Sequence, residues 1–302
     1  MACIAFDENK LKVLLVEVKD RKSKDLRMRN FWSERLKTQP ISSLTPNDIA
    51  DALIENIKKL NFESSISNDK IYILSESQLF DETAIKQIQQ KLSLIQFKNI
   101  NFIGPAENCK LVFESLQLPD KSMVIDANFE HTYVIGHSVS GVSKNGFGGI
   151  ELKNTDYKSI ESGVLNLEAY KTNLNRHVND LFLANDFSKK NEAIYLTGDW
   201  SWAFYTLFGG GSLQNEFAEI KLEDLQKHQV TLEQKFYRYE SLATANIEGE
   251  RVLKNFNKEQ LLVGNSILLS LLDHLKDSKD KRLFYAQNFA KAKMLYYLKN
   301  KL

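Results

Sequence analysis

Ile4-Ala5-Phe6-Asp7 and Met123-Val124-Ile125-Asp126 are two apolar stretches that each end in an aspartate, and they decide how the fold is read. A second apolar run follows each of them, Leu11 to Val18 after the first and His131 to Gly136 after the second. Short apolar runs bounded by polar turns are typical of strands joined in a hairpin. The pattern therefore predicts that each half of the chain opens with a strand, a tight turn and a returning strand, so that one fold is used twice.

The composition indicates a folded chain without a strong charge bias. The 302 residues are enough for two domains, and 43% apolar residues can bury a core in each. Forty basic and 39 acidic residues give a formal net charge of +1, which offers no electrostatic footprint for duplex nucleic acid or for an anionic membrane. Cys3 and Cys109 are the two cysteines, so a disulfide framework or a structural zinc site is not expected. A cytoplasmic location fits this cysteine usage, the early charges at Asp7 and Lys10, and the lack of an apolar run of membrane-spanning length.

Helical and strand patterns alternate after the first hairpin. Thr45-Pro46-Asn47-Asp48 opens a helix with a capping residue, a proline at the first position and an early acid. Strands are predicted at 70–74 and 100–103, with an amphipathic helix at 81–95 between them. This alternation predicts an α/β layer. The strongly basic segment from Lys19 to Arg29 reads either as a solvated hairpin or as a guide for a polyanion.

A second unit is predicted to begin near Lys121. After its opening strands, the segment 164–184 has helical spacing, and a buried strand follows at 193–196. That strand runs into Thr197-Gly198-Asp199, an arrangement that can aim backbone N–H groups into a cleft. The remaining residues read as largely helical, at 222–228, 232–242, 258–275 and 281–298.

Several of these segments resemble motifs of one enzyme family. Ile103-Gly104-Pro105-Ala106-Glu107-Asn108 is similar in place to the family's Ser-Gly-x-Glu-Glu-Ala. Ser122-Met123-Val124-Ile125-Asp126 occupies the place of its second phosphate strand, and Leu196-Thr197-Gly198-Asp199-Trp200 that of its Gly-Thr-Gly-Gly-Thr. The family is that of the exopolyphosphatases and guanosine pentaphosphate phosphohydrolases (Ppx/GppA), within the actin, sugar-kinase and heat-shock-protein ATPase superfamily. The resemblance covers nearly the whole chain.

The resemblance implies an α/β fold class with two ribonuclease-H-like (actin-like ATPase) domains flanking a central cleft. The first domain is expected at 1–120 and the second at 121–280, and it stays open whether the last helix, 281–302, returns to the first. Whether the chain forms a homodimer also stays open.

The resemblance also implies a set of site residues. Glu107 takes the place of the catalytic glutamate that orients or deprotonates water. Asp7 and Asp126 are the candidate acids for Mg²⁺, the cofactor expected if the protein is active. The candidate phosphate-binding glycines are Gly198, Gly209, Gly210 and Gly211. The implied ligands are polyphosphate or a phosphorylated nucleotide such as guanosine pentaphosphate.

Each of these residues also has a structural interpretation that the sequence leaves open. Glu107 reads equally as a surface residue after a Gly-Pro turn, Asp126 as a residue that ends a strand, and Asp7 with Glu8 as a solvated turn. The glycine triplet also suits a flexible loop. His131 is either an acid/base group or a packed residue. The aromatic cluster, Trp200, Trp202, Phe204, Tyr205 and Phe208, suits base stacking or a core.

The two turns depart from the family pattern because they contain no glycine. The first reads Asp7-Glu8-Asn9-Lys10. An ungapped match to the family motif puts Ala5 at the position of the family's aspartate, whereas a match shifted by two residues puts Asp7 there. In the second, Asp126 remains, but Ala127, Asn128 and Phe129 replace small residues. Glycine lets backbone amides converge on phosphate, so these turns predict weak or lost hydrolysis. The alternatives are a non-catalytic nucleotide-sensing or protein-interaction module on the same fold and, more weakly, a kinase-like or assembly-forming member of the superfamily.

Overall fold

The computed structural model describes residues 1–7, 10–35, 44–77, 80–119, 121–128, 131–137, 147–153, 166–184, 191–209, 217–275 and 281–302. The chain forms two units. Unit 1 consists of Met1–Gln117 and Phe289–Leu302, and unit 2 consists of Leu118–Asn288. Among the described residues, no helix combines the length and the apolar character needed to cross a membrane.

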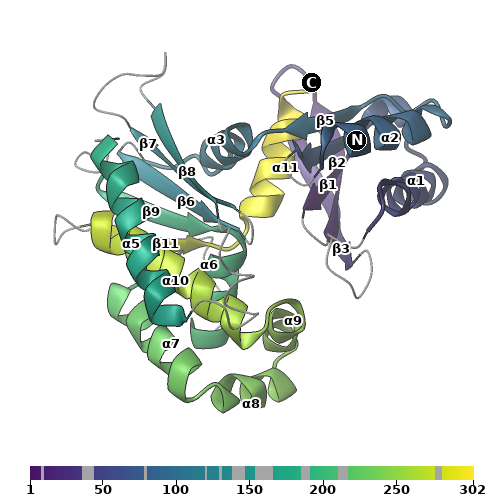
Figure 1. The fold of residues 1–302 in the computed structure, drawn as a ribbon. Coiled ribbons are helices and arrows are strands. Elements are labelled where there is room, and N and C mark those ends of the chain that lie inside the picture. Colours follow the sequence, from purple (N-terminus) through teal and green to yellow (C-terminus); the bar gives the residue numbers. More distant parts are fainter. Residues whose placement is uncertain are drawn as a thin grey trace. The chain divides into compact units, whose positions relative to one another are not determined.

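Unit 1 is built on a mixed sheet with the strand order β3-β2-β1-β4-β5. The hairpin strands are β1 (Ala2–Asp7), β2 (Lys10–Asp20) and β3 (Asp25–Arg35), which pair antiparallel. On the other side of β1, β4 (Ile71–Glu76) and β5 (Ile100–Ile103) run parallel to it. The helices are α1 (Pro46–Glu63), α2 (Glu82–Ser93), α3 (Pro105–Ser115) and α11 (Phe289–Lys299) (Figure 1).

Alternation of apolar side chains along β1 gives unit 1 a core on each face of its sheet. Ile4 and Phe6 point to the face that buries the apolar stripes of α1 and α2. Cys3 and Ala5 point to the opposite face, where they meet Met294, Tyr297 and Leu298 of α11. Both faces of β1 are therefore buried, as expected for the central strand of a sheet that helices cover on both faces.

The start of α1 follows from its sequence. The Thr45 side chain accepts from the Asp48 backbone N–H at 3.2 Å, and the Asp48 carboxylate accepts from the Thr45 backbone N–H at 3.1 Å. This reciprocal cap satisfies two donors that a helix otherwise leaves unpaired, and Pro46 stands at the first helical position. The predicted helix start is confirmed.

Unit 2 is built on a sheet with the order β10-β11-β9-β6-β7-β8. Its strands are β6 (Ser122–Ala127), β7 (His131–His137), β8 (Phe147–Lys153), β9 (Ala193–Thr197), β10 (Phe217–Ile220) and β11 (Arg282–Ala286). Its helices are α5 (Leu167–Ala184), α6 (Gly198–Phe204), α7 (Leu222–Gln234), α8 (Tyr237–Ala245), α9 (Ile247–Asn255) and α10 (Lys258–Leu275). A π-helical turn, Tyr205–Gly209, continues α6. One face of the sheet, with Met123 and Ile125, packs on α5, α6 and α10.

The two sheets repeat one topology. The order β3-β2-β1-β4-β5 in unit 1 corresponds to β8-β7-β6-β9-β11 in unit 2, with an antiparallel hairpin on one side of the central strand and parallel strands on the other. The α/β class and the use of one ribonuclease-H-like fold twice are confirmed, whereas a cleft between the units stays a prediction.

The last predicted helix, 281–298, is wrong in its first part. Arg282–Ala286 forms β11, which pairs parallel with β9 and antiparallel with β10, and α11 begins only at Phe289. Local propensity was overridden because the edge of β9 offers backbone partners that a helix at this position would leave unpaired. The helix predicted at 232–242 is also interrupted, since α7 ends at Gln234 and α8 begins at Tyr237.

Candidate functional site

Asp126 lies next to the carboxyl end of the central strand of unit 2. In the parallel pairing of β6 with β9, Asp126 stands opposite Thr197. The Thr197 hydroxyl donates to Asp126 Oδ1 at 2.8 Å, and Thr197 is fully buried while Asp126 is 3% exposed. One oxygen of this carboxylate is therefore bound by a neighbouring strand.

Gly198 closes the same end of the sheet by backbone contact. Its φ of +87° is in the region that side chains other than glycine avoid. A Cβ at this position would lie 2.4 Å from the carbonyl oxygen of Ala127 and 2.8 Å from its nitrogen. The strand-ending residues of β6 and the start of α6 thus touch through main chain, and only glycine fits between them.

The aromatic cluster after Gly198 belongs to the core. Trp200 and Phe204 are 3% and 2% exposed, and the other three aromatic side chains are partly buried against the same cluster. The rings of Trp200 and Phe256 are tilted by 47° at a centroid distance of 4.9 Å, and the Trp200 indole occupies the space that a side chain at Gly264 of α10 would need. The core interpretation of this cluster is confirmed. Gly209 ends the π-helical turn, whereas Gly210 and Gly211 lie outside the described residues.

In unit 1, the first turn connects β1 to β2. Asp7 is the last residue of β1 and pairs with Lys10, but its side chain, Glu8 and Asn9 lie outside the described set. The buried pairs Ile4–Ile73 in unit 1 and Ile125–Leu196 in unit 2 each join the central strand to its parallel neighbour. Whether Ala5 or Asp7 is the counterpart of Asp126 stays open, because Ile4–Ile73 and Phe6–Ser75 are both pairs of β1 with β4 that can be matched to Ile125–Leu196.

Glu107 lies in the first turn of α3 and is exposed. The Gly-Pro turn of the sequence is the start of this helix, with Gly104 as the N-cap and Pro105 at the first position. Burial raises the pKa of Tyr297 in α11 to about 12, and the nearby Cys3 and, less strongly, the Glu107 carboxylate add to this shift. Glu107 therefore lies within electrostatic range of α11. For His131, which begins β7, the side chain lies outside the described residues.

A buried polar cluster beside Glu107 escaped the sequence analysis. Asn108 Nδ2 donates to Glu76 Oε1 at 2.7 Å, and Lys293 Nζ donates to Asn108 Oδ1 at 2.8 Å. Lys293 Nζ also lies 3.7 Å from Glu76 Oε1, and the three residues are 3% to 8% exposed. They come from β4, α3 and α11 and fix the first turn of α3 on the sheet. Lys293 shares the last helix with Lys291 and Lys299, so the sequence held no signal that singled it out.

The donor set does not make a metal site by itself. Among the described residues, no group of three or more His, Cys, Asp or Glu side chains is arranged to hold a metal ion. Mg²⁺ is often held by one or two carboxylates together with substrate phosphates and water. Asp126 is the acid in unit 2 that suits that role. Its burial and its hydrogen bond from Thr197, however, make its carboxylate poorly accessible to a metal ion.

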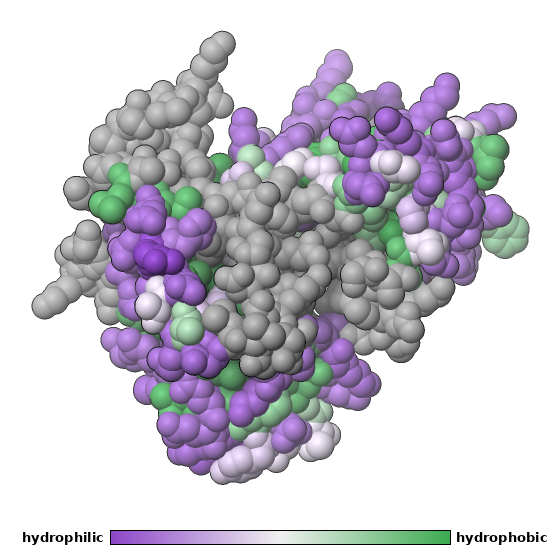
Figure 2. Space-filling view, in the orientation of Figure 1, coloured by the Kyte–Doolittle hydropathy of each residue, from purple (hydrophilic) through white to green (hydrophobic). Residues whose placement is uncertain are grey.

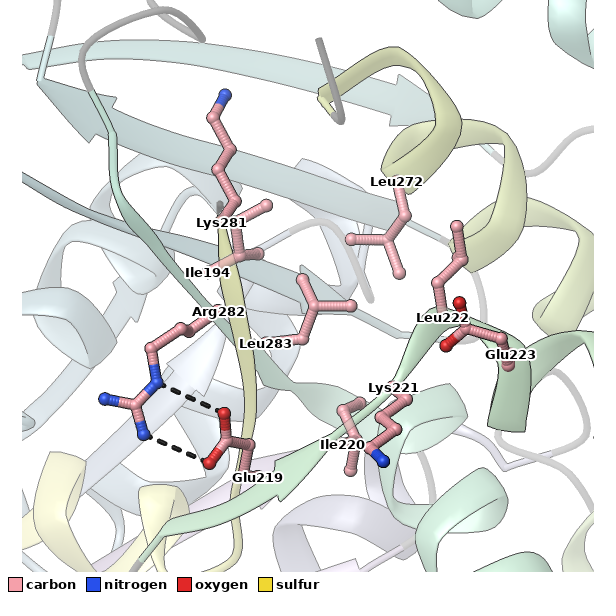
Figure 3. A pocket seen from close by; sticks show the side chains of 10 residues that line it. All are labelled: Ile194, Glu219, Ile220, Lys221, Leu222, Glu223, Leu272, Lys281, Arg282 and Leu283. Carbon is pink, nitrogen blue, oxygen red and sulfur yellow. Dashed lines mark hydrogen bonds and ion pairs between the residues drawn. The ribbon is translucent and has the colours of Figure 1, made fainter. Parts of the chain in front are cut away.

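A pocket of about 490 Å³ lies at the other end of the unit 2 sheet (Figure 3). Ile194 and Leu283 line it near the amino ends of β9 and β11. Asp126 and Gly198 lie instead at the carboxyl ends of β6 and β9. At its rim, Arg282 donates to both carboxylate oxygens of Glu219 at 3.1 and 3.0 Å. The pocket is therefore separate from Asp126 and Gly198.

Comparison with known proteins identifies the fold. No protein-family model and no curated protein sequence matches the chain. An exopolyphosphatase from Cytophaga hutchinsonii matches with a TM-score of 0.68 at 12% identity, covering 100% of this chain and 98% of that one. Two Aquifex aeolicus structures match over 97% of this chain and 98% of theirs: a PPX-GPPA enzyme at 12% identity with a TM-score of 0.66, and the type II variant of the Ppx/GppA phosphatase at 13% with 0.62. The chain therefore has the duplicated α/β fold of the exopolyphosphatases and Ppx/GppA phosphatases.

Proposed function

We propose that this protein is a Ppx/GppA-like phosphatase-family protein with weak or lost hydrolysis of the terminal phosphoanhydride in polyphosphate or guanosine pentaphosphate. The fold supports the family, and the chemistry of the two turns supports the loss. Electrostatic stabilisation by preorganised donors is commonly the largest contribution to such a reaction.

The observation that carries this proposal is the closed end of β6. Asp126 is 3% exposed and accepts from Thr197, while Gly198 packs onto the backbone of Ala127. The next residues in the sequence are Asn128 and Phe129 rather than glycines. Losing one preorganised donor typically costs about 100- to 1,000-fold in rate. Here the second turn lacks the glycines that would let several backbone N–H donors point at a phosphate group. In the ungapped match to the family, Ala5 stands at the position of the aspartate in unit 1.

Glu107 is the residue on which residual hydrolysis would depend. It is exposed in the first turn of α3, and the Glu76–Asn108–Lys293 cluster holds that turn on the sheet. An exposed carboxylate in a fixed turn can orient a water molecule if a phosphoanhydride lies within reach. The alternative function, a non-catalytic nucleotide-sensing or protein-interaction module, is favoured by the same closed turn of β6.

Phosphate release by the purified protein tests the proposal. Long-chain polyphosphate and guanosine pentaphosphate are offered with saturating Mg²⁺ to the wild type and to the variants Glu107→Gln and Glu114→Gln. Glu114 is the matched control because it lies on the same helix about two turns further on. We expect little release, equal in all three proteins. Robust turnover that disappears only in Glu107→Gln would establish an active hydrolase and contradict the proposal.

Ligand binding is measured separately from turnover. Nucleotides, guanosine tetraphosphate and short polyphosphate are titrated with and without Mg²⁺ while thermal unfolding is followed. A ligand present at 100 times its Kd stabilises the folded state by about 2.7 kcal/mol. Stabilisation without phosphate release supports the nucleotide-sensing alternative, whereas no stabilisation by any of these ligands supports the protein-interaction alternative.

A further inference from the structure

The tip of the β2–β3 hairpin gathers positive charge that the proposed function does not use. From Lys19 to Arg29 the sequence has six basic and two acidic residues, a formal charge of +4 in a chain whose total is +1. The segment includes the turn at 21–24 between the two strands. The rest of the chain therefore has a slightly negative net charge, whereas the charge of this hairpin is positive.

Two of the acidic groups at the hairpin, Glu17 and Asp20, are engaged by neighbouring residues, whereas Asp25 is exposed. The Glu17 carboxylate binds Lys19 Nζ at 2.8 Å and also pairs with Arg29. The Asp20 carboxylate builds the turn, since it accepts from the Ser23 hydroxyl at 2.7 Å and from the Lys22 backbone N–H at 2.9 Å. In the described part of the chain, four exposed cationic side chains of the tip make no ion pair or side-chain hydrogen bond: Arg21, Lys22, Lys24 and Arg27.

The tip lies far from the first turn of the same unit. Asp7 pairs with Lys10 at one end of β2, and β1 begins opposite Leu15, so the hairpin continues past the start of β1. From Lys10 to Asp20 the strand extends about 33 Å at 3.3 Å per residue. Figure 1 shows the hairpin loop beside the C-terminus, and Val18 and Leu302 share one apolar cluster. A ligand at the tip is therefore distinct from a phosphate held at the first turn.

The chemistry of the tip favours a chain of phosphates without bases. Lysine and arginine side chains bind phosphate oxygens through charge-assisted hydrogen bonds. Proteins that bind single-stranded nucleic acid combine such cations with aromatic side chains on which bases stack. The segment from Lys19 to Arg29 contains no aromatic residue, and its apolar residues are the buried Leu26 and the exposed Met28.

We propose that the β2–β3 hairpin tip is a docking element for a linear inorganic polyphosphate chain, with Arg21, Lys22, Lys24 and Arg27 as its cations. The choice of a phosphate chain as occupant rests on the proposed function. The docking itself requires no hydrolysis, because the tip is remote from Asp7. Figure 2 shows hydrophilic residues over much of the visible surface of the described chain, so the tip is distinguished by charge rather than by polarity.

Fluorescence anisotropy with labelled long-chain polyphosphate tests the docking. The test variant replaces all four tip cations by Gln. The matched control makes the same charge change at dispersed exposed positions, Lys58→Gln, Lys86→Gln, Lys235→Gln and Arg238→Gln. For four phosphate contacts, a threefold rise in salt is expected to weaken wild-type binding roughly 20-fold. We expect the tip variant to lose most of the affinity and most of this salt dependence, and the control to keep both.

The outcomes separate this inference from the proposed function. Equal affinity of the tip variant and the control, or no binding by the wild type at low salt, would overturn the docking site. A single-stranded oligonucleotide of matched charge that binds the wild type as tightly as polyphosphate would overturn the choice of occupant. Failure of the proposed function appears instead as phosphate release that depends on Glu107, and the Glu107→Gln variant keeps all four tip cations.

Discussion

Replacing Gly198 by alanine tests whether the end of β6 is closed in the way that the structure describes. The substitution adds one methyl group between two main-chain segments. Gly198 has φ of +87°, and the new Cβ would meet the carbonyl oxygen of Ala127 at 2.4 Å and its carbonyl carbon at 2.6 Å. Neither contact can be relieved by rotating a side chain, because both atoms belong to the backbone of β6.

Two independent penalties set the magnitude. A residue with a Cβ in the left-handed region costs about 1–2 kcal/mol. Forcing an extra carbon into a packed site typically costs about 1–3 kcal/mol more. The sum is about 2–5 kcal/mol. For a unit of the size of unit 2, each kcal/mol lowers Tm by about 2–4 °C, so a decrease of roughly 4–20 °C is expected.

Thermal unfolding followed by tryptophan fluorescence measures this loss. Trp200 and Trp202 report on unit 2, and Trp200 lies in the helix that Gly198 begins. The control is Gly249→Ala in α9, where a Cβ would have its nearest contact at an ordinary 3.5 Å. Alanine is the better helix former by about 1 kcal/mol, so this variant should be as stable as wild type or slightly more so. A Gly198→Ala protein that melts with the wild type would refute the described contact between α6 and β6.

Two further predictions concern buried polar groups. Burial lowers the pKa of His228 to about 3, while its ring nitrogen Nδ1 lies 2.7 Å from the Tyr239 hydroxyl. The unfolded chain takes up this proton near pH 6.5, so the stability from neutral His228 is present above that pH and is lost as the pH falls toward 3. Urea unfolding at pH 5 should show a loss of about 2 kcal/mol relative to pH 7 that is absent in His228→Asn, and equal pH dependence in both proteins would contradict this assignment. Lys293→Met leaves the Glu76 carboxylate buried without its cation and should cost about 3–5 kcal/mol in urea unfolding. The double variant Lys293→Met with Glu76→Leu should recover part of that loss, and a double variant no more stable than Lys293→Met would show that the two charges are not coupled.

Local sequence patterns determined the elements and their order. The strand patterns of 4–7 and 123–126 depend on alternating side chains and nearby turn residues, which act within a few positions of one another. The same holds for the start of α1, where Thr45 and Asp48 cap each other across three residues. The repeat of an opening hairpin in each half was therefore readable before any contact between distant residues was known.

Tertiary structure alone decided which distant residues meet. The Glu76–Asn108–Lys293 cluster joins three elements, and no periodic pattern links a lysine in the last helix to a strand more than two hundred positions earlier. The strand β11 likewise depends on the edge that β9 presents, so its own residues suggested a helix. Gly198 was recognisable as a glycine after a strand, but the reason for it is the backbone of Ala127, which only the folded sheet brings against it. Local sequence determines helices, strands and their caps because propensity and capping act over a few residues. The burial and pairing of polar groups depend instead on neighbours that the whole fold supplies.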